Sequence, residues 1–506
     1  MIALGRKGAS SGSFVRDFTA SIVVFLVAMP LCMGIAIASG VPPEKGLITG
    51  IIGGLVVGFL AGSPLQVSGP AAGLAVIVFE LVRDHGLSAL GPILVLAGIL
   101  QFVAGVAKLG GFFRSISPAV VHGMLAGIGA LIVIGQFHIL FDGKPLSNGL
   151  DNLAAMPGRV LGLSTDLRAT EFALMIGLVT IGVMLAWEKL RPTSLKLVPG
   201  ALLGVMAATL IAWMTGLDIA RVDVPASLIN SIDAPGEGFF TSLGNPALIA
   251  TALAIAFIAS AETLLSAAAV DRMHDGPRTD YNKELRAQGV GNLLCGFAGA
   301  LPMTGVIVRS SANVQAGAQT RKSTILHGVW ILGFVALLPW LLREIPMAAL
   351  GGILVVTGWR LVSVAHVTHL FKNYGLLPAA TWAVTFALVV TTDLLTGVLA
   401  GLAMSLLELI PYRKSLRLKV EEDHAEEESR VSLHGSATFV SLTRLTAVLE
   451  GIPSGRAVHL DLHRLKGIDH TSAEMVKEWL ARRNGAGKPV QLSGPGPMLS
   501  RLAAAH

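Results

Sequence analysis

The stretch that decides the fold is Leu65-Gln66-Val67-Ser68-Gly69-Pro70-Ala71-Ala72-Gly73, an extended run that leads into a glycine-rich turn. A second extended run, Gly305-Val306-Ile307-Val308-Arg309, occurs in the other half of the chain. Each run precedes or opens an apolar segment (70–82 or 311–318) that is too short to cross a bilayer, since a helical span needs about 20 residues. Extended backbone at membrane depth is tolerated only where protein or a water-filled cavity satisfies its polar groups. The two runs therefore predict a pair of interrupted spans inside a membrane domain.

The composition also indicates a membrane protein. The chain has 506 residues, of which 53% are hydrophobic and 14% are charged, whereas a soluble protein of this length needs many more charges to cover its surface. The 58 glycines fit a packed helical bundle, because small residues let transmembrane helices approach closely. The net charge of +6 is ordinary for basic cytoplasmic loops and, without interleaved aromatic residues, does not favour nucleic acid. Cys32 and Cys295 lie in apolar runs and predict neither a disulfide framework nor a zinc site.

About fourteen apolar segments recur along the chain. Their approximate bounds are 18–39, 47–62, 70–82, 90–107, 118–140, 168–187, 197–215, 246–270, 285–301, 311–318, 323–342, 346–360, 376–392 and 393–410. The first is too long for the apolar core of a signal peptide, so we interpret it as a transmembrane helix. Lys and Arg are concentrated in alternate loops and in the tail after the last segment. This asymmetry predicts a multi-pass protein of the inner (plasma) membrane with both ends in the cytoplasm.

The two short segments occupy matching places, the third of each set of about seven. A matched pair of interrupted segments is the best sequence pointer to the substrate site of a transporter. Because seven is an odd number, the two halves have opposite orientations. The predicted fold is an α-helical polytopic membrane protein whose transmembrane segments, about fourteen in all, form a seven-plus-seven inverted repeat.

A small soluble domain is expected after the membrane part. The runs at 457–462 and 489–492 are typical of strands, and an amphipathic helix is expected between them at about 472–483. The acidic run 421–428 is interpreted as part of a solvated linker. The predicted domains are a cytoplasmic N-terminal segment (1–17), a transmembrane transport domain (18–412), a charged linker (413–430) and a short α/β domain (431–506).

The interrupted spans predict an anion site. Their helices are expected to begin at about Pro70 and Ser311, with unpaired backbone N–H groups directed at one shared spot. Helix N-termini carry partial positive charge and free donors, so this spot favours an anion. Proline suits a first helical turn, and the stretch Ser68-Gly69-Pro70-Ala71 lets a ligand approach the backbone. The alternative is an ordinary glycine-rich motif for helix packing.

Two charged residues stand inside apolar segments, where a charge is costly and marks a functional site by default. Arg309, followed by Ser310, is expected to add positive potential to the anion site; the alternative is a structural pair with Glu262. Glu262 suits a coupling-ion site for Na⁺ or H⁺, with the hydroxyl of Ser266 one helical turn further on the same face. The alternative for Glu262 is a carboxylate that only holds Arg309 or the helix packing.

Two asparagines within apolar segments are weaker signals. Asn292 and Asn313 are expected to satisfy backbone groups that the interruptions leave free.

Several of these runs resemble the SulP (sulfate permease) family of anion transporters, and the resemblance covers nearly the whole chain. The matching runs of the membrane part are Met29-Pro30, Val67-Ser68-Gly69-Pro70, Glu262-Thr263-Leu264-Leu265-Ser266, Pro302-Met303-Thr304-Gly305 and Arg309-Ser310-Ser311-Ala312-Asn313. The C-terminal part resembles a STAS domain in the runs Leu460-Asp461-Leu462 and Ile468-Asp469-His470-Thr471-Ser472.

The resemblance implies a uracil-permease-like fold, with a core domain of segments 1–4 and 8–11 and a gate domain of segments 5–7 and 12–14. It also implies elevator-type alternating access and a homodimer. The residues that it places at the substrate are Pro30, Ser68, Gly69, Pro70, Ala71, Arg309, Ser310 and Ser311. Those that we assign to the coupling ion are Glu262, Ser266, Thr304 and Gly305, since Glu262 falls where family members carry the acidic residue tied to coupling.

Two features depart from the family pattern. Many members have Gln after the proline of the first helix, whereas Leu31 and Cys32 follow Pro30 here, so a polar substrate contact is lost or moved. The STAS-like domain is short, and Thr471 or Ser472 falls near the phosphorylatable position of related domains. A plain helix N-cap is the other interpretation of that position.

The predicted function is secondary transport of a small inorganic anion, coupled to Na⁺ or H⁺. Bicarbonate ranks first and sulfate second, because the run 30–36 resembles bacterial members that carry bicarbonate or other inorganic anions. H⁺-coupled transport of a dicarboxylate such as fumarate or succinate is one alternative. Another is a membrane sensor that binds an anion and signals through the STAS-like domain.

An enzyme is not expected, because we find no nucleophile–base pair, phosphate loop or metal-ligand spacing. We therefore expect no cofactor and no tightly bound metal, only the transported and coupling ions. The expected partners are the small anion, the lipid bilayer, a second copy of the chain and a regulatory protein at the STAS-like domain.

Overall fold

The computed structural model describes residues 8–114, 116–146, 149–161, 167–225, 227–271, 273–274, 276–412, 415, 417–424, 428–453, 456–485 and 490–503. Within these residues, eight helices are long and apolar enough to cross a membrane, and three shorter helices of 10–17 residues are also apolar. They confirm the predicted α-helical polytopic membrane protein. The count of fourteen spans and the location of the two ends stay predictions.

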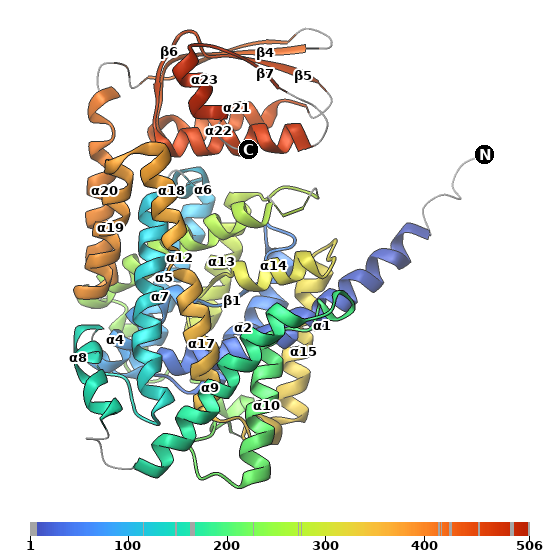
Figure 1. The fold of residues 1–506 in the computed structure, drawn as a ribbon, viewed down its shortest axis with the longest axis vertical. Helices are drawn as coiled ribbons and strands as arrows, with labels where there is room; N and C mark the ends of the chain where they lie inside the picture. The colour runs from blue at the N-terminus through green and yellow to red at the C-terminus, as the bar shows by residue number, and fades with distance from the viewer. Residues whose placement is uncertain are drawn as a thin grey trace. The chain divides into compact units, whose positions relative to one another are not determined.

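The helices of the membrane part are labelled in Figure 1, and their bounds follow in chain order. They are α1 (Gly8–Ala38), α2 (Pro43–Ile52), α3 (Gly58–Leu60), α4 (Ala75–His85), α5 (Leu90–Val106), α6 (Gly110–Arg114), α7 (Pro118–Leu140), α8 (Gly149–Val160), α9 (Leu167–Leu190), α10 (Gly200–Thr215), α11 (Phe239–Ser242), α12 (Pro246–Asp271), α13 (Tyr281–Phe297), α14 (Ile307–Gln315), α15 (Lys322–Leu337), α16 (Pro339–Leu342), α17 (Met347–Leu361), α18 (Val364–Tyr374), α19 (Leu376–Thr391) and α20 (Leu394–Leu407). Two strands of three residues each, β1 (Ser68–Pro70) and β2 (Met303–Gly305), interrupt this series. Strand β1 lies inside the first run that the sequence singled out. Strand β2 lies just before the second run and shares only Gly305 with it, and the expectation that residues 307–309 are extended is wrong, because α14 already begins at Ile307.

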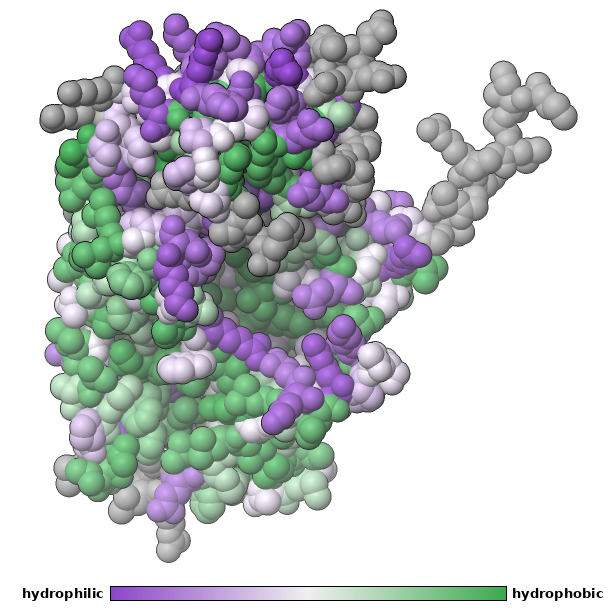
Figure 2. Space-filling view, turned by 45° about the horizontal axis from the view of Figure 1, so that its top comes forward, coloured by the Kyte–Doolittle hydropathy of each residue, from purple (hydrophilic) through white to green (hydrophobic). Residues whose placement is uncertain are grey.

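Large hydrophobic side chains remain exposed along these helices. Leu253 of α12 is 59% exposed, and Trp359 of α17 is 68% exposed. Figure 2 shows hydrophobic residues over much of the helical bundle and hydrophilic residues over the C-terminal domain. Apolar surface on this scale is stable against lipid rather than against water.

The chain forms two compact units. The first contains residues 1–110, 128–362 and 390–394, and it includes both short strands. The second contains residues 111–127, 363–389 and 395–506, so it groups α18, most of α19 and α20 with the C-terminal domain.

In the first unit, α5 and α13 pack backbone against backbone along a glycine seam. Gly91, Gly98 and Gly105 recur every seventh residue of α5, and Gly289 and Gly296 do the same on α13. A Cβ built on Gly98 would lie 2.5 Å from the backbone nitrogen of Leu293. The composition predicted that glycines let helices approach closely, and the glycines of this seam do so.

The C-terminal domain is a five-stranded sheet covered by helices. Its strands are β3 (Lys419–His424), β4 (Glu428–Ala437), β5 (Ala457–Asp461), β6 (Leu465–Ile468) and β7 (Val490–Ser493), and its helices are α21 (Leu442–Gly451), α22 (His470–Gly485) and α23 (Gly496–Ala503). The order is β3-β4-β5-β7 with β6 beside β4, and only the β3–β4 pair is antiparallel. Strands β5 and β7 and helix α22 confirm the predicted α/β elements.

The acidic run was misinterpreted as a linker. Residues 419–424 form β3, which pairs with β4 along its whole length. Val420 packs against the domain core, and the charged residues Lys419 and Glu421 stand on either side of it along the strand. A charged strand at the edge of a sheet discourages pairing with other chains, so the acidic composition fits an edge strand as well as a linker.

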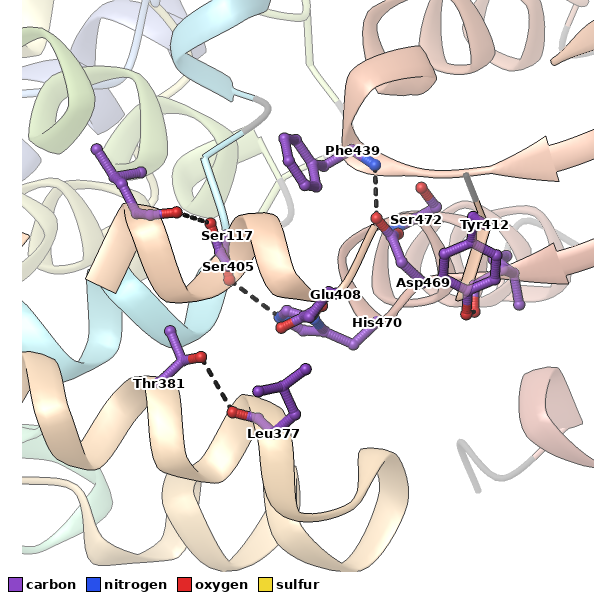
Figure 3. Close-up of polar contacts among 12 residues, drawn as sticks. Ser117, Leu377, Thr381, Ser405, Glu408, Tyr412, Phe439, Asp469, His470 and Ser472 are labelled. Carbon is purple, nitrogen blue, oxygen red and sulfur yellow. Dashed lines mark hydrogen bonds and ion pairs between the residues drawn. The ribbon is translucent and has the colours of Figure 1, made fainter. Parts of the chain in front are cut away.

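Within the second unit, α22 is joined to the membrane helices by buried polar contacts (Figure 3). His470 Nδ1 lies 2.6 Å from a carboxylate oxygen of Glu408, just after α20, and Nε2 lies 3.2 Å from the hydroxyl of Ser117, just before α7. His470 and Glu408 are both buried. The start of α22 therefore lies against residues of the transport helices inside one compact unit.

The N-cap of α22 is Asp469 rather than Thr471 or Ser472. The carboxylate of Asp469 accepts the backbone N–H of Ser472 at 2.7 Å and that of Phe439 at 2.6 Å. Burial raises the pKa of Asp469, while these two hydrogen bonds oppose the rise. Thr471 and Ser472 are both buried, so in this structure neither hydroxyl is open to a modifying enzyme.

The α5–α13 seam generates the first prediction. Gly98→Ala should lower the free energy of unfolding by about 1–3 kcal/mol, because the added methyl group forces the two backbones apart. The measurement is the thermal unfolding midpoint of the purified protein. Gly182→Ala is the control, since a Cβ at Gly182 of α9 would meet nothing within 4 Å. Equal midpoints for the two variants would contradict the seam.

Candidate functional site

The two interrupted spans meet at a short antiparallel ladder in the first unit. Ser68 lies opposite Gly305, Gly69 opposite Thr304, and Pro70 opposite Met303. Because the strands are antiparallel, the chain leaves toward α4 from one end of the ladder and toward α14 from the other. The predicted meeting of the two spans is therefore confirmed.

The residues at which the helices begin differ from the prediction. Pro70 ends β1 instead of opening a helix, and a 3₁₀ turn over Ala72–Leu74 precedes α4. At the other end, the N–H of Val306 still donates to the carbonyl of Val67 at 2.9 Å, which extends the ladder pattern by one residue. Helix α14 therefore begins at Ile307, four residues before the expected start at Ser311.

Arg309 lies in the first turn of α14 and is fully buried. Its guanidinium lies beside the thiol of Cys32 from α1 and is close enough to His327 of α15 for an electrostatic interaction. Among the described residues, no carboxylate pairs with Arg309, and its three nitrogens are buried without a hydrogen-bond partner. An isolated buried cation is very costly, and an anion would be the group that complements it.

Two glycines of the first interrupted span make room for the two intramembrane charges. A Cβ on Gly69 would lie 2.1 Å from Nη1 of Arg309. A Cβ on Gly73 would lie 2.6 Å from Oε2 of Glu262. The glycine-rich motif therefore leaves the space that both charged side chains occupy, and it is not only a helix-packing motif.

Glu262 and Arg309 approach the same span but do not form an ion pair with each other in the described part of the chain. The structure therefore does not support a purely structural Arg309–Glu262 pair. Oε2 of Glu262 is buried without a hydrogen-bond partner among the described residues, and so is the hydroxyl of Thr304 on β2. Ser266 follows one turn after Glu262 and is buried. These oxygens are of the kind that Na⁺ or a proton would bind.

Helix α12 also fixes the second strand. The hydroxyl of Thr263 accepts the N–H of Gly305 at 3.1 Å, and the side-chain amide of Gln66 donates to the carbonyl of Thr263 at 2.9 Å. Gly305 is required here, because a Cβ would lie 1.8 Å from the amide nitrogen of Gln66. Glu262 is thus carried by a helix turn that is bonded to both interrupted spans.

The other predicted substrate residues make local contacts around the ladder or lie in α1. The hydroxyl of Ser310 accepts the N–H of Val67 and donates to the carbonyl of Val306, so it holds the ladder together. Ser311 donates to the carbonyl of Val308. Ala71 is buried, and its N–H donates to Pro302. Pro30 is buried inside the continuous helix α1, two residues before the Cys32 that reaches Arg309.

Sequence reasoning found some of the supporting residues and missed others. Asn313 donates to the carbonyl of Leu65, and Asn292 bonds the backbone of Met303, which confirms the role expected of both asparagines. Glu284 and Gln288 of α13, which lie in the same region, were missed. Their signal was the spacing of four residues from Glu284 to Gln288 to Asn292, which places the three polar side chains on one face of α13.

Comparison with known proteins identifies the domains of the chain. Residues 14–385 match the model of the sulfate permease family, and residues 420–505 match a STAS domain model. A putative sulfate transporter of Bacillus subtilis, YvdB, is 30% identical over 487 residues, which is 93% of this chain and 89% of the relative. The bicarbonate transporter BicA of Picosynechococcus is 25% identical over 371 residues, 69% of this chain and 63% of the relative.

A solved structure shares the fold. The structure of SLC26A9 superposes with a TM-score of 0.71 at 15% identity, covering 97% of this chain and 86% of that one. Together with the family match over the membrane part, this likeness establishes the helical transporter fold followed by a STAS domain. The chain therefore belongs to the sulfate permease family of anion transporters.

Proposed function

We propose that the chain is a secondary transporter of a small inorganic oxyanion, with bicarbonate as the first candidate and sulfate as the second, coupled to Na⁺ or H⁺ at Glu262. The observation that carries the proposal is the buried guanidinium of Arg309, which has no carboxylate partner among the described residues. The relatives named as a putative sulfate transporter and a bicarbonate transporter support the choice of substrate class.

The anion site consists of one full charge and backbone donors. Arg309 belongs to the first turn of α14, and N–H groups of a first turn have no intrahelical acceptor. The partial positive charge of the helix start and the guanidinium therefore act on the same spot. One cation and a few backbone donors suit a compact oxyanion better than a long substrate with two separated carboxylates.

Coupling follows from the position of Glu262. Gly69 seats Arg309 and Gly73 seats Glu262, so the two charges lie along the same short stretch of the first span. An ionised Glu262 would repel an anion that approaches Arg309 in a low-dielectric site. A proton or Na⁺ at Glu262 removes that repulsion, and the two ligands then favour each other's binding. We assign Ser266 and Thr304 as further oxygen ligands of the cation and Gly305 as the residue that fixes Thr304 in place.

The wider arrangement is also a proposal. We propose elevator-type alternating access, a homodimer, and an inner-membrane location with both ends in the cytoplasm, all supported by the family to which the chain belongs. We further propose that the transport domain covers residues 18–412. The STAS domain then provides a regulatory surface, supported by its buried contacts with Glu408 and Ser117 in the second unit.

Flux into proteoliposomes separates the candidate functions. Labelled bicarbonate, sulfate and fumarate are compared under imposed Na⁺ and pH gradients. Fumarate flux that bicarbonate does not inhibit would favour the dicarboxylate alternative. Anion binding without net flux of any of the three would favour a sensor and overturn the proposal.

Arg309→Gln should lower anion uptake at sub-saturating substrate at least about ten-fold, because a charged hydrogen-bond donor contributes about 1.5–3 kcal/mol. The measurement is initial uptake into proteoliposomes. Arg360→Gln is the matched control, since Arg360 is an exposed residue that pairs with Glu188 near the end of α17. Uptake by Arg309→Gln at the level of the control would remove Arg309 from the site.

Glu262→Gln should abolish the dependence of uptake on Na⁺ or pH, because the neutral amide needs no cation to relieve repulsion of the anion. The measurement is uptake with and without each gradient. Glu171→Gln is the control, because Glu171 is an exposed residue of α9. The coupling proposal fails if Glu262→Gln keeps the ion dependence of the unmodified protein.

Gly69→Ala should raise the substrate KM several-fold at a similar amount of folded protein, because the new methyl group displaces the guanidinium of Arg309. The control is Gly333→Ala in α15, where a Cβ would meet nothing within 4 Å. The measurement is the concentration dependence of uptake for both variants. An unchanged KM for Gly69→Ala would show that the seat of Arg309 does not determine anion affinity.

A further inference from the structure

Helix α13 presents a buried polar stripe toward the β1–β2 ladder. Glu284, Gln288 and Asn292 are spaced four residues apart, which places them on one face of the helix. All three are 0% exposed. Three polar side chains on one face of a helix in a membrane bundle are costly unless each is hydrogen-bonded, so the bonds they make define what the stripe does.

The first two residues of the stripe are hydrogen-bonded to the first interrupted span. Oε2 of Glu284 accepts the N–H groups of Gly62 and Ser63, at 2.8 and 2.9 Å, just before β1. The amide of Gln288 donates to the hydroxyl of Ser68 at 2.6 Å and to Oε1 of Glu284 at 3.0 Å. The first strand and the turn before it are therefore bonded to two successive turns of α13.

The third residue of the stripe holds the second strand. The amide oxygen of Asn292 accepts the N–H of Met303 at 2.8 Å, and its NH₂ group donates to the carbonyl of Met303 at 3.1 Å. The same NH₂ group donates to Gln101 of α5 at 2.7 Å. One helix thus bonds β1 at Ser68 and β2 at Met303.

Helix α13 is also packed closely against α5. Gly289 and Gly296 hold α13 against α5 with backbone contacts, and a Cβ on Gly289 would lie 2.5 Å from the backbone nitrogen of Phe102. The helix that carries the stripe therefore has no room to move closer to α5.

The Gln288 amide has one orientation in the structure. Its NH₂ group faces Oε1 of Glu284 at 3.0 Å, as suits a carboxylate, which only accepts hydrogen bonds. The same NH₂ group then donates to Ser68, whose neighbour Gly69 seats Arg309. Gln288 is consequently linked to the proposed anion site through two adjacent residues of β1.

We propose that Gln288 is a positioning residue of the anion site. The stripe of Glu284, Gln288 and Asn292 holds the β1–β2 ladder in place and so sets the distance between the ladder and Arg309 on α14. The inference rests on the proposed function for its effect on transport, and on geometry alone for its effect on the ladder. Glu284 serves position and not coupling, because hydrogen bonds from two backbone N–H groups and one amide already satisfy its carboxylate. Glu262, with an unpartnered oxygen, keeps the coupling role.

The first test replaces the amide without changing the volume greatly. Gln288→Leu should raise the substrate KM about ten-fold with a smaller change in the maximal rate, because the loss leaves Ser68 unheld and Glu284 short of one donor. Gln319→Leu, at an exposed side chain, is the matched control. Hydrogen exchange of the full-length protein is measured alongside, and residues 62–70 should exchange faster in Gln288→Leu alone.

The second test is a rescue. Gln288→Glu places two buried carboxylates one helical turn apart and should be more damaging than Gln288→Leu. The exchange variant Glu284→Gln with Gln288→Glu restores one amide–carboxylate bond and leaves an acceptor for the hydroxyl of Ser68. It should reverse most of the rise in KM caused by Gln288→Glu. A residue that acts only through packing would show no such rescue.

The outcomes separate this inference from the proposed function. An unchanged KM and unchanged exchange in Gln288→Leu overturns the positioning role. Failure of the exchange variant to improve on Gln288→Glu overturns it as well. If the unmodified protein moves no anion, the proposed function fails, and faster exchange at residues 62–70 still decides whether Gln288 holds the ladder.

Discussion

The structure depends on one costly feature, a guanidinium buried in the membrane part without a carboxylate partner among the described residues. Arg309 occupies the first turn of α14 and packs against Gly69, where any side chain would collide with it. Removing a cation from water costs several kcal/mol even after the protein relaxes. A fold that keeps such a charge must gain from it elsewhere, and a bound anion is the gain that fits the chemistry.

Two glutamates of the first unit differ in the hydrogen bonds that their carboxyl groups make. The carboxyl oxygens of Glu284 accept hydrogen bonds from two backbone N–H groups and one side-chain amide. Glu262 leaves one oxygen unpartnered beside Gly73. A group without fixed donors is the one whose charge a proton or a cation can change. Residue type alone does not distinguish the two, since both are glutamates on helices of the membrane part.

Much of this site could be predicted from the sequence, because its signals are local. Two short spans in matching positions, a proline and glycines before one, and an arginine before the other indicated the meeting point and its charge. The sequence also indicated that Asn292 and Asn313 satisfy freed backbone. It could not place the helix starts, since a strand pairing over Val67 to Pro70 depends on the partner run more than 230 residues away.

The residues that sequence reasoning missed share a physical reason. Glu284 and Gln288 lie in the polar first half of α13, where polar side chains are common, and their partners lie at Gly62, Ser63 and Ser68, more than 200 residues earlier. The acidic run at 421–428 was misinterpreted for a related reason. A single apolar residue, Val420, among charged ones is a weak strand signal, and the pairing of residues 419–424 with β4 decides that they form a strand, while residues 425–427 lie outside the described part of the chain.

The shortness of the ladder explains why its supports matter. Two strands of three residues form too few hydrogen bonds to be stable alone. Their geometry is therefore set by what they are bonded to, namely Thr263 on α12 and the polar stripe on α13. In this arrangement the proposed anion site is not a property of the two interrupted spans by themselves. It is produced where two continuous helices, one of them held by a glycine seam, fix the crossing point at which Arg309 and Glu262 face the same short segment of chain.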